Sequence, residues 1–318
     1  MINHRRRADW VLLAWAALHW GAAAHAASAT NRFGFTGPEI FPIDPLIAVL
    51  QVADFDGDGL NDLLVANNSR SKINILYNQT GQTNPAGSRK PAIKREINEL
   101  PPDARFRIES IASEKRISSL AVADLNDDGR PDIAYYGEPK ELVAHFNHAS
   151  NAWSAPKRWP IEDGDLSPNA LAAGDLNSDG LKDLVLLAEK CVYVLAQTPE
   201  HTLAEPVKIP IGSPVKSVQV LDVDGDRRND LLLVNWESQT PFRFRLQDKT
   251  GQLGPELYFS MPPVRSYWAD NLEANEQVQI ISIAQSSGRA AVSQFVRKPA
   301  EPLGKFRQGQ FQVLPLSK

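Results

Sequence analysis

Four short segments place Asp and Asn side chains at alternate positions of a loop. The copies begin at Asp54, Asp124, Asp175 and Asp222 and read D-x-[DN]-x-D, with Gly at position 6 in the first three and a further Asp at position 9 in all four. Side-chain oxygens at positions 1, 3, 5 and 9, with the backbone carbonyl of position 7, supply the oxygen ligands that calcium prefers. We therefore predict a calcium site in each segment.

The predicted ligands occupy the same five positions in every copy. They are Asp54, Asp56, Asp58, Leu60 and Asp62; Asp124, Asn126, Asp128, Arg130 and Asp132; Asp175, Asn177, Asp179, Leu181 and Asp183; and Asp222, Asp224, Asp226, Arg228 and Asp230. Leu and Arg at position 7 would act through their carbonyls. The fourth site is expected to be weaker than the other three, because Arg227 stands where a left-handed backbone favours Gly.

An EF-hand begins in the same way but differs in its later residues. It closes with Glu at position 12 and lies between helices. Here position 12 is Val65, Tyr135, Leu186 or Leu233, each within an apolar run of strand length. The EF-hand interpretation therefore fails in all four copies.

The loops are spaced 70, 51 and 47 residues apart, and an eroded fifth copy begins at Asp270. Apolar runs such as Ile117–Ala123 and Leu184–Leu187 precede and follow the loops, and two further short runs complete each repeat. Four strands in about 48 residues is the size of a propeller blade. We predict an all-β propeller of about five four-stranded blades, over residues 46–115, 116–162, 163–211, 212–262 and 263–316.

Two features concern the length and the closure of the array. The first unit is longer than the others, and its excess between Thr80 and Lys115 is expected to be a surface insertion. Residues 33–43 resemble a fourth strand that could close the ring with the last blade, and residues 306–316 compete for the same place. The sequence leaves both possibilities open.

The first 26 residues predict export. A basic stretch at His4–Arg7, an apolar stretch from Trp10 to Ala23 and the small-x-small site at Ala24–Ala26 are typical of a cleaved signal peptide. The alternative is an uncleaved membrane anchor. With the signal removed, residues 27–318 would be a secreted or periplasmic propeller without a membrane span.

Composition excludes one class of partner and one source of stability of the fold. The net charge of −4 lacks the basic excess expected of a nucleic-acid binder, so nucleic acid is excluded as a partner. Cys191 is the only cysteine, so no internal disulfide can form. Its apolar neighbours predict a buried core residue.

The calcium loop between strands, repeated at blade length, resembles the FG-GAP/VCBS repeat family of propellers, which also occurs in integrin α-subunits. The resemblance covers roughly residues 46–300 and implies the ligand roles given above for the first three loops. In the fourth loop Arg227 departs from the pattern, and in the fifth most ligands are missing. The family includes adhesion modules, extracellular scaffolds and some carbohydrate-active lyases.

No catalytic residue can be assigned from the sequence. His145, His148 and His201 lack a zinc-binding spacing, and neither a nucleophile elbow nor a phosphate-binding loop is present. We predict a non-enzymatic binding, adhesion or scaffold module for an extracellular protein or glycan, with a polysaccharide-active lyase as the alternative. Trp236 and Trp268 could stack on a sugar ring, or they could pack between blades.

Overall fold

The computed structural model describes Phe41 and residues 43–81, 104–148, 152–212, 214–271, 278–297 and 309–314. All described strands belong to one compact unit, Pro42–Lys318, and Phe41 alone is described from Met1–Phe41. The predicted signal peptide, residues 33–40 of the proposed closing strand and residues 82–103 of the predicted insertion lie outside the described residues. Within the described part, no helix is long and apolar enough to cross a bilayer.

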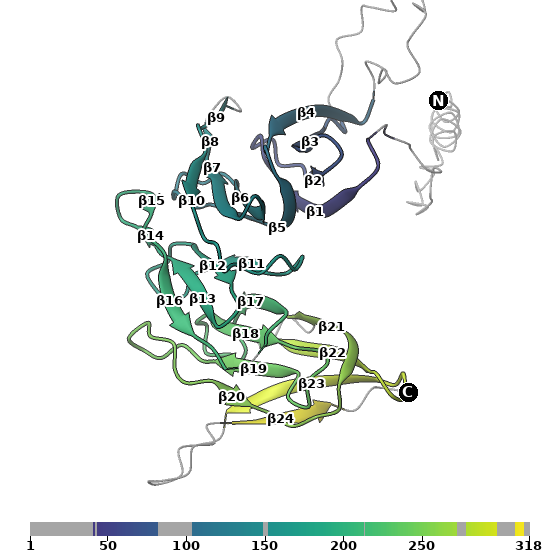
Figure 1. Cartoon of the computed structure of the whole chain (residues 1–318), viewed down its shortest axis with the longest axis vertical. Coiled ribbons are helices and arrows are strands. Elements are labelled where there is room, and N and C mark those ends of the chain that lie inside the picture. The colour runs from purple at the N-terminus through teal and green to yellow at the C-terminus, as the bar shows by residue number, and fades with distance from the viewer. Residues whose placement is uncertain are drawn as a thin grey trace, which may run out of the picture. The chain divides into compact units, whose positions relative to one another are not determined.

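The strands form five antiparallel sheets of four strands each, and strand order follows the chain (Figure 1). The first two sheets comprise β1 (Ile47–Ala53), β2 (Asp62–Asn67), β3 (Lys72–Asn78) and β4 (Phe106–Ala112), then β5 (Arg116–Ala123), β6 (Asp132–Glu138), β7 (Glu141–His145) and β10 (Lys157–Trp159). The third comprises β11 (Leu171–Gly174), β12 (Asp183–Leu187), β13 (Cys191–Leu195) and β16 (Val207–Pro210).

The last two sheets repeat the same order. They comprise β17 (Ser217–Leu221), β18 (Asp230–Val234), β19 (Phe242–Arg245) and β20 (Leu257–Tyr258), then β21 (Val264–Asp270), β22 (Gln279–Ala284), β23 (Ala290–Arg297) and β24 (Gly309–Leu314). The predicted all-β class and the five four-stranded sheets are confirmed. The fourth strand of the last sheet comes from β24, which lies within the segment 306–316 that the sequence offered for this place.

Each Asp loop joins the first and second strands of its sheet, as its flanking apolar runs predict. The residue before each loop pairs with the Asp at position 9, as Ala53 does with Asp62 and Ala123 with Asp132. The loop therefore closes a β-hairpin, and the position-9 Asp opens the second strand. The second strands are almost entirely buried, and their apolar side chains point to both faces of the sheet.

The apolar core lies between consecutive sheets. One cluster joins the first two sheets, with Leu64 and Tyr135 among its members, and a second joins the second, third and fourth sheets. A third joins the last two sheets, where the rings of Phe244 and Phe295 lie 5.7 Å apart. Cys191 belongs to the second cluster, which confirms its prediction as a core residue.

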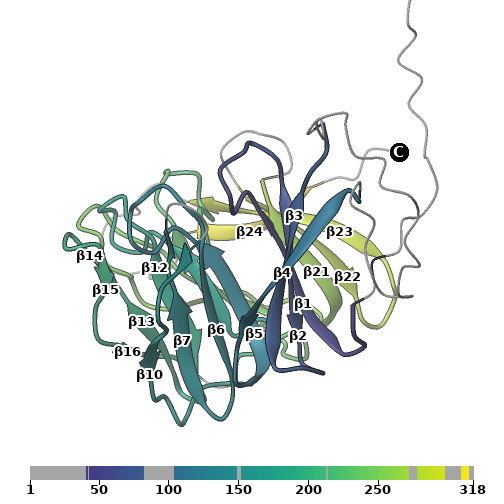
Figure 2. The same cartoon turned by 90° about the horizontal axis from the view of Figure 1, so that it is seen from above.

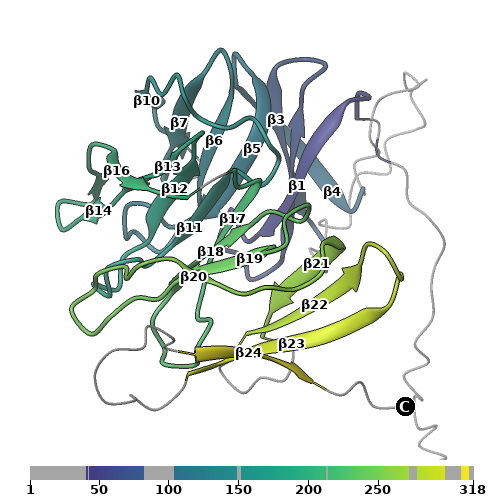
Figure 3. The same cartoon turned by 60° about the horizontal axis from the view of Figure 1, so that its bottom comes forward.

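The first strands of the five sheets face a common centre. β1 contacts β5, β5 contacts β11, and β11 contacts β17. Figure 2 shows β1 and β5 side by side, and Figure 3 shows β1, β5, β11 and β17 on the inner side of the sheets. A cavity of about 610 Å³ is lined by residues of β1, β5, β11, β17 and β21. The fourth strands lie at the opposite edge of each sheet.

Small hairpins follow the third strand in three of the sheets. The second sheet carries β8 (Asn147–His148) with β9 (Ala152–Trp153), and the third carries β14 (Gln197–Thr198) with β15 (Thr202–Leu203). The fourth sheet has an equivalent bridge between Gln247 and Leu253. The sequence pattern did not predict these hairpins, which contact the Asp loops of neighbouring sheets.

Candidate metal centre

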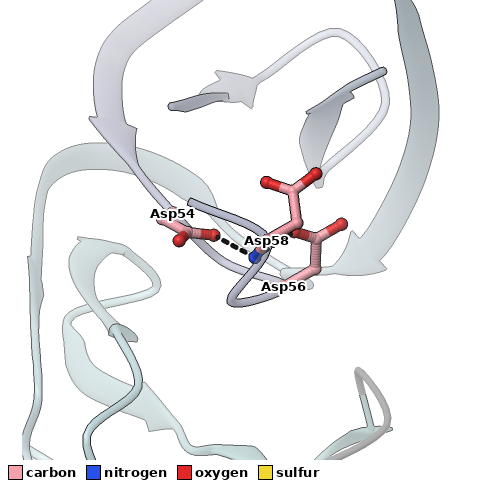
Figure 4. A group of neighbouring side chains, drawn as sticks. All are labelled: Asp54, Asp56 and Asp58. Carbon is pink, nitrogen blue, oxygen red and sulfur yellow. Dashed lines mark hydrogen bonds between the residues drawn. The ribbon is translucent and has the colours of Figure 1, made fainter. Parts of the chain in front are cut away.

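The first Asp of each loop organises the backbone of the turn. Asp54 accepts hydrogen bonds from the backbone N–H groups of Gly57 at 2.7 Å, Asp58 at 3.2 Å and Gly59 at 2.9 Å. Figure 4 shows the bond from Asp58. Asp222 does the same for the backbone of Gly225, Asp226 and Arg227. The side chain at position 1 therefore helps to shape the turn, because it satisfies donors that a tight turn would leave free.

Two residues of each loop adopt a left-handed backbone, at positions 4 and 6. In the first loop these are Gly57 and Gly59, with φ of 76° and 84°. Arg227 has φ of 68° at position 6 of the fourth loop, which confirms the strained conformation predicted there. Asp127 and Ser178 bear the same strain at position 4 of the second and third loops, with φ of 56° and 60°.

Three carboxylates converge in the first and fourth loops. Oxygen atoms of Asp54, Asp56 and Asp58 all lie within 4.8 Å of one another, and so do those of Asp222, Asp224 and Asp226. Calcium–oxygen distances of about 2.3–2.6 Å place ligands up to about 5 Å apart, so both triads fit such an ion. These two triads could hold metal ions.

The second and third loops have the same backbone but one carboxylate fewer at the turn. Asn126 donates its side-chain N–H to Asp128 at 3.3 Å, and Asn177 donates to Asp179 at 2.8 Å. Asp124 and Asp175 bind the loop backbone as Asp54 does. These loops hold themselves together through an amide–carboxylate hydrogen bond in place of the third negative charge.

At position 7, the backbone N–H groups point toward the position-5 carboxylates. Leu60 donates to Asp58 and Leu181 to Asp179, both at 2.8 Å, and Arg130 and Arg228 donate to Asp128 and Asp226 at 3.0 Å. Arg228 also forms an ion pair with Asp226 through its guanidinium group. The fourth loop therefore carries a built-in positive charge that offsets part of its triad.

The position-9 carboxylates lie deepest. The four position-9 carboxylates are buried, and each accepts one backbone N–H from position 2 of its loop and one from the last residue of the third strand or just after it; they are Asp62, Asp132, Asp183 and Asp230. Burial raises the pKa of Asp132 and of Asp230 to about 7 and that of Asp183 to about 6. The backbone hydrogen bonds act against this shift.

Residues 124–186, which contain the second and third loops, match the family described as FG-GAP-like repeat. The chain carries an FG-GAP-like repeat. No curated protein sequence matches it.

One solved structure shares the fold of this chain, and two others show a weaker similarity. A lectin of Agrocybe aegerita, described as recognising non-reducing terminal N-acetylglucosamine, superimposes with a TM-score of 0.54 at 14% identity over 83% of this chain and 64% of its own. The Photorhabdus luminescens Tc holotoxin pore gives 0.43 at 18% identity over 85% of this chain and 12% of its own. BBS1N in complex with ARL6DN superimposes with a TM-score of 0.42 at 13% identity over 87% of this chain and 84% of its own. The chain thus spans less than two thirds of the lectin chain and a small part of the toxin chain.

The Asp loop of one sheet is covered by residues of the next sheet. The side chain of Asn147 donates to the carbonyl of Phe55 at 2.8 Å. Trp153 of the same hairpin packs on the Phe55 ring, with the ring centres 6.2 Å apart. In the third loop, Gln247 donates to the carbonyl of Asp175 at 3.4 Å. His201 lies 3.9 Å from the carboxylate of Asp127 in the second loop.

The residues that cover the loops belong to a recurring sequence pattern. An Asn or Gln, namely Asn78, Asn147, Gln197 or Gln247, follows each position-9 Asp by 14 to 17 residues and donates its backbone N–H to it. In two of these residues the side chain also reaches the preceding loop. The regular spacing of these amide residues marks them as partners of the position-9 Asp, although it does not identify the loop that each side chain reaches.

The fifth loop retains little of the repeat. Asp270 ends β21 and is exposed, and its carboxylate accepts the backbone N–H of Asn271 at 2.8 Å. Residues 272–277, which would complete this loop, lie outside the described residues.

The two tryptophans proposed as a sugar platform have different environments. Trp236 is half-buried against the cluster between the last two sheets, and the Lys216 ammonium lies 5.3 Å from its ring centre. Trp268 is 61% exposed. One face of Trp236 is therefore already occupied by a cation, whereas Trp268 is open to solvent.

Proposed function

We propose that this chain is an exported, calcium-stabilised propeller that binds glycans as a non-enzymatic recognition or adhesion module. The observation that carries the proposal is the carboxylate triad of Asp54, Asp56 and Asp58, built into a loop whose turn is already formed by backbone hydrogen bonds. Such a loop is preorganised for a cation, and an ion there would tie the first two strands of a sheet together.

Calcium is the metal that this donor set favours. The ligands would be Asp54, Asp56 and Asp58 in the first loop and their counterparts in the other three, and the donors are all oxygen atoms. Two positive charges would offset the carboxylates of a triad, whose mutual repulsion otherwise favours an open loop. The bound ion would supply structure, and ligand recognition would fall to other parts of the surface.

The glycan part of the proposal draws on the fold. The lectin that shares this fold is described as recognising a terminal N-acetylglucosamine. An export signal, expected at residues 1–26, would bring the module to surfaces where glycans are exposed. A fold alone does not define a ligand, so binding requires a direct test.

Two measurements test the proposal. Thermal unfolding of the mature protein in EGTA should occur many degrees lower than in calcium, since an ion that binds only the folded state adds about 2.7 kcal/mol at one hundred times its Kd. Magnesium should not replace calcium. A glycan array with calcium present should give saturable binding without substrate turnover, and release of unsaturated sugar products would show a lyase instead.

A further inference from the structure

The cavity between the first strands has a mixed aliphatic and amide lining. Its volume is about 610 Å³, within the roughly 300–1,000 Å³ of small-ligand sites. Aliphatic surface comes from residues such as Leu50, Leu171 and Val220, and polar side chains are contributed by Gln51, Asn169, Gln219 and Asp270. Asp270 is the one charged residue among the described residues that line it.

One of these amides retains bonding capacity. The side-chain Oε1 of Gln219 on β17 is buried and has no hydrogen-bond partner within the described part of the chain. Gln51 donates to the carbonyl of Leu120 at 3.5 Å, a long contact. A buried acceptor without a donor is unfavourable, and because water cannot reach this atom, the Gln219 side chain would have to rotate toward the cavity before a ligand hydroxyl or amide group could bind it.

The walls add backbone groups. β1, β5, β11, β17 and β21 are each the edge strand of their sheet, and an edge strand presents N–H and C=O groups that its own sheet does not use. One such group links neighbouring sheets, because Val218 of β17 donates its backbone N–H to the carbonyl of Asn169, just before β11, at 3.0 Å. Donors and acceptors therefore alternate with small aliphatic side chains along the walls.

This combination matches the chemistry of an uncharged sugar. Each hydroxyl group both donates and accepts hydrogen bonds, as the amide side chains do. The C–H face of a pyranose ring packs on aliphatic surface. The carboxylate of Asp270, together with the lack of a basic side chain among the described lining residues, disfavours acidic sugars.

We propose that the cavity between the first strands is the glycan site and that it takes the end of a neutral oligosaccharide. This proposal rests on the glycan-binding function proposed above and assigns its location. The calcium loops then stabilise the sheets whose first strands form the wall.

The test compares two cavity variants with one matched control, all in calcium. Ala48 is exposed on β1 and lines the cavity, so Ala48→Phe narrows it without entering the core. Asn169→Ala removes one amide from the exposed loop before β11. The control is Ala152→Phe, which adds the same ring at an exposed position on β9, in a hairpin that does not line the cavity.

Binding is measured by calorimetry with chitotriose, cellotetraose and mannotriose as neutral probes and trigalacturonate as the acidic probe. Wild-type protein and Ala152→Phe should bind at least one neutral probe. Ala48→Phe should abolish this binding, and Asn169→Ala should weaken it about tenfold, the equivalent of one hydrogen bond. Melting temperatures confirm that each variant is folded.

The outcomes separate the two proposals. Neutral-sugar binding that survives both cavity variants would overturn the cavity as the site and leave the glycan-binding function standing. Failure of the wild-type protein to bind any probe of the panel or any glycan of the array would overturn both. A preference for trigalacturonate would contradict the neutral-sugar assignment.

Discussion

The side-chain amide of Asn147 lies 2.8 Å from the backbone carbonyl of Phe55, 92 residues earlier in the chain. The backbone N–H of the same residue donates to Asp132 at 2.7 Å. One residue thus connects the Asp loop of the first sheet to the buried carboxylate of the second. Two sheets with separate hairpins become a single cooperative structure at this point.

Replacement of Asn147 by Ala should reduce the free energy of unfolding by about 1–3 kcal/mol, because the Phe55 carbonyl would remain buried without its donor. Asn78 provides the control, since it occupies the same place in the first sheet. Its side-chain amide donates to the carbonyl of Asn61, in the Asp loop of the same sheet. Asn78→Ala should cost clearly less in urea unfolding. Equal losses would show that the contact between sheets adds nothing.

The turn at Gly251 should tolerate no side chain. A Cβ atom at Gly251 would lie 2.0 Å from the carbonyl oxygen of Asn177 in the third loop, whereas one at Gly81 would meet nothing within 4 Å. The two glycines have nearly the same φ, 77° and 81°. Gly251→Ala should therefore be less stable than Gly81→Ala by about 1–3 kcal/mol, the usual cost of overpacking. Equal melting temperatures would disprove the close contact.

Replacing the left-handed residue of the fourth loop by glycine should increase the stability of the protein. Arg227→Gly should stabilise the protein by up to about 1 kcal/mol, because Gly adopts φ of 68° without strain. Gly180→Ala makes the opposite change at the equivalent position of the third loop and should destabilise it by a similar amount. If Arg227→Gly lowers the melting temperature, side-chain interactions of Arg227 outweigh the strain.

His145 should make the protein sensitive to acid. It is buried, it stacks on Tyr135 with ring centres 5.9 Å apart, and burial lowers its pKa below the ordinary 6.5. The folded state therefore binds fewer protons than the unfolded state, and the stability that this provides is present above pH 6.5 and is lost as the pH falls.

The variant His145→Phe keeps the stacked ring and removes the titrating group. Its melting temperature should change less between pH 7 and pH 5 than that of the wild-type protein. His148→Phe, at an exposed position three residues later, should leave the wild-type dependence unchanged. An unaltered pH profile in His145→Phe would assign the acid sensitivity to other groups.

The two tryptophans should respond differently to truncation. Trp268→Ala should change the free energy of unfolding by no more than about 0.5 kcal/mol, as exposed positions do. Trp236→Ala should cost more, although less than the about 3–5 kcal/mol of a fully buried ring. Similar losses for both variants in chemical denaturation would refute the difference in packing.

Much of the fold could be predicted from residues that are close together in the sequence. The Asp loops and the apolar runs on either side of them predict hairpins, because loop geometry and strand periodicity depend on residues close in the chain. The strained φ of Arg227 was predictable for the same reason. Blade length and strand number followed from the spacing of the loops.

The contacts between sheets could not be predicted in this way. The cover that Asn147 and Trp153 provide for Phe55 joins residues about ninety positions apart, and no periodicity reports such a distance. The metal role predicted for Asp62 remains a prediction; the structure shows that its oxygens already accept two backbone hydrogen bonds. The half-buried position of Trp236 likewise depends on the neighbouring sheet.

The staggered cover of the loops has a consequence for how such arrays can be duplicated. A loop and the hairpin that shields it are encoded in different sheets, so copying or deleting one sheet separates partners on both sides of the cut. Loss of the segment after β19 would remove Gln247 and Gly251, which lie against the third loop. The sequence of the third loop itself would stay intact. Recombination between repeats should therefore succeed only when the exchanged sheet brings a compatible amide residue and a turn that fits the preceding loop.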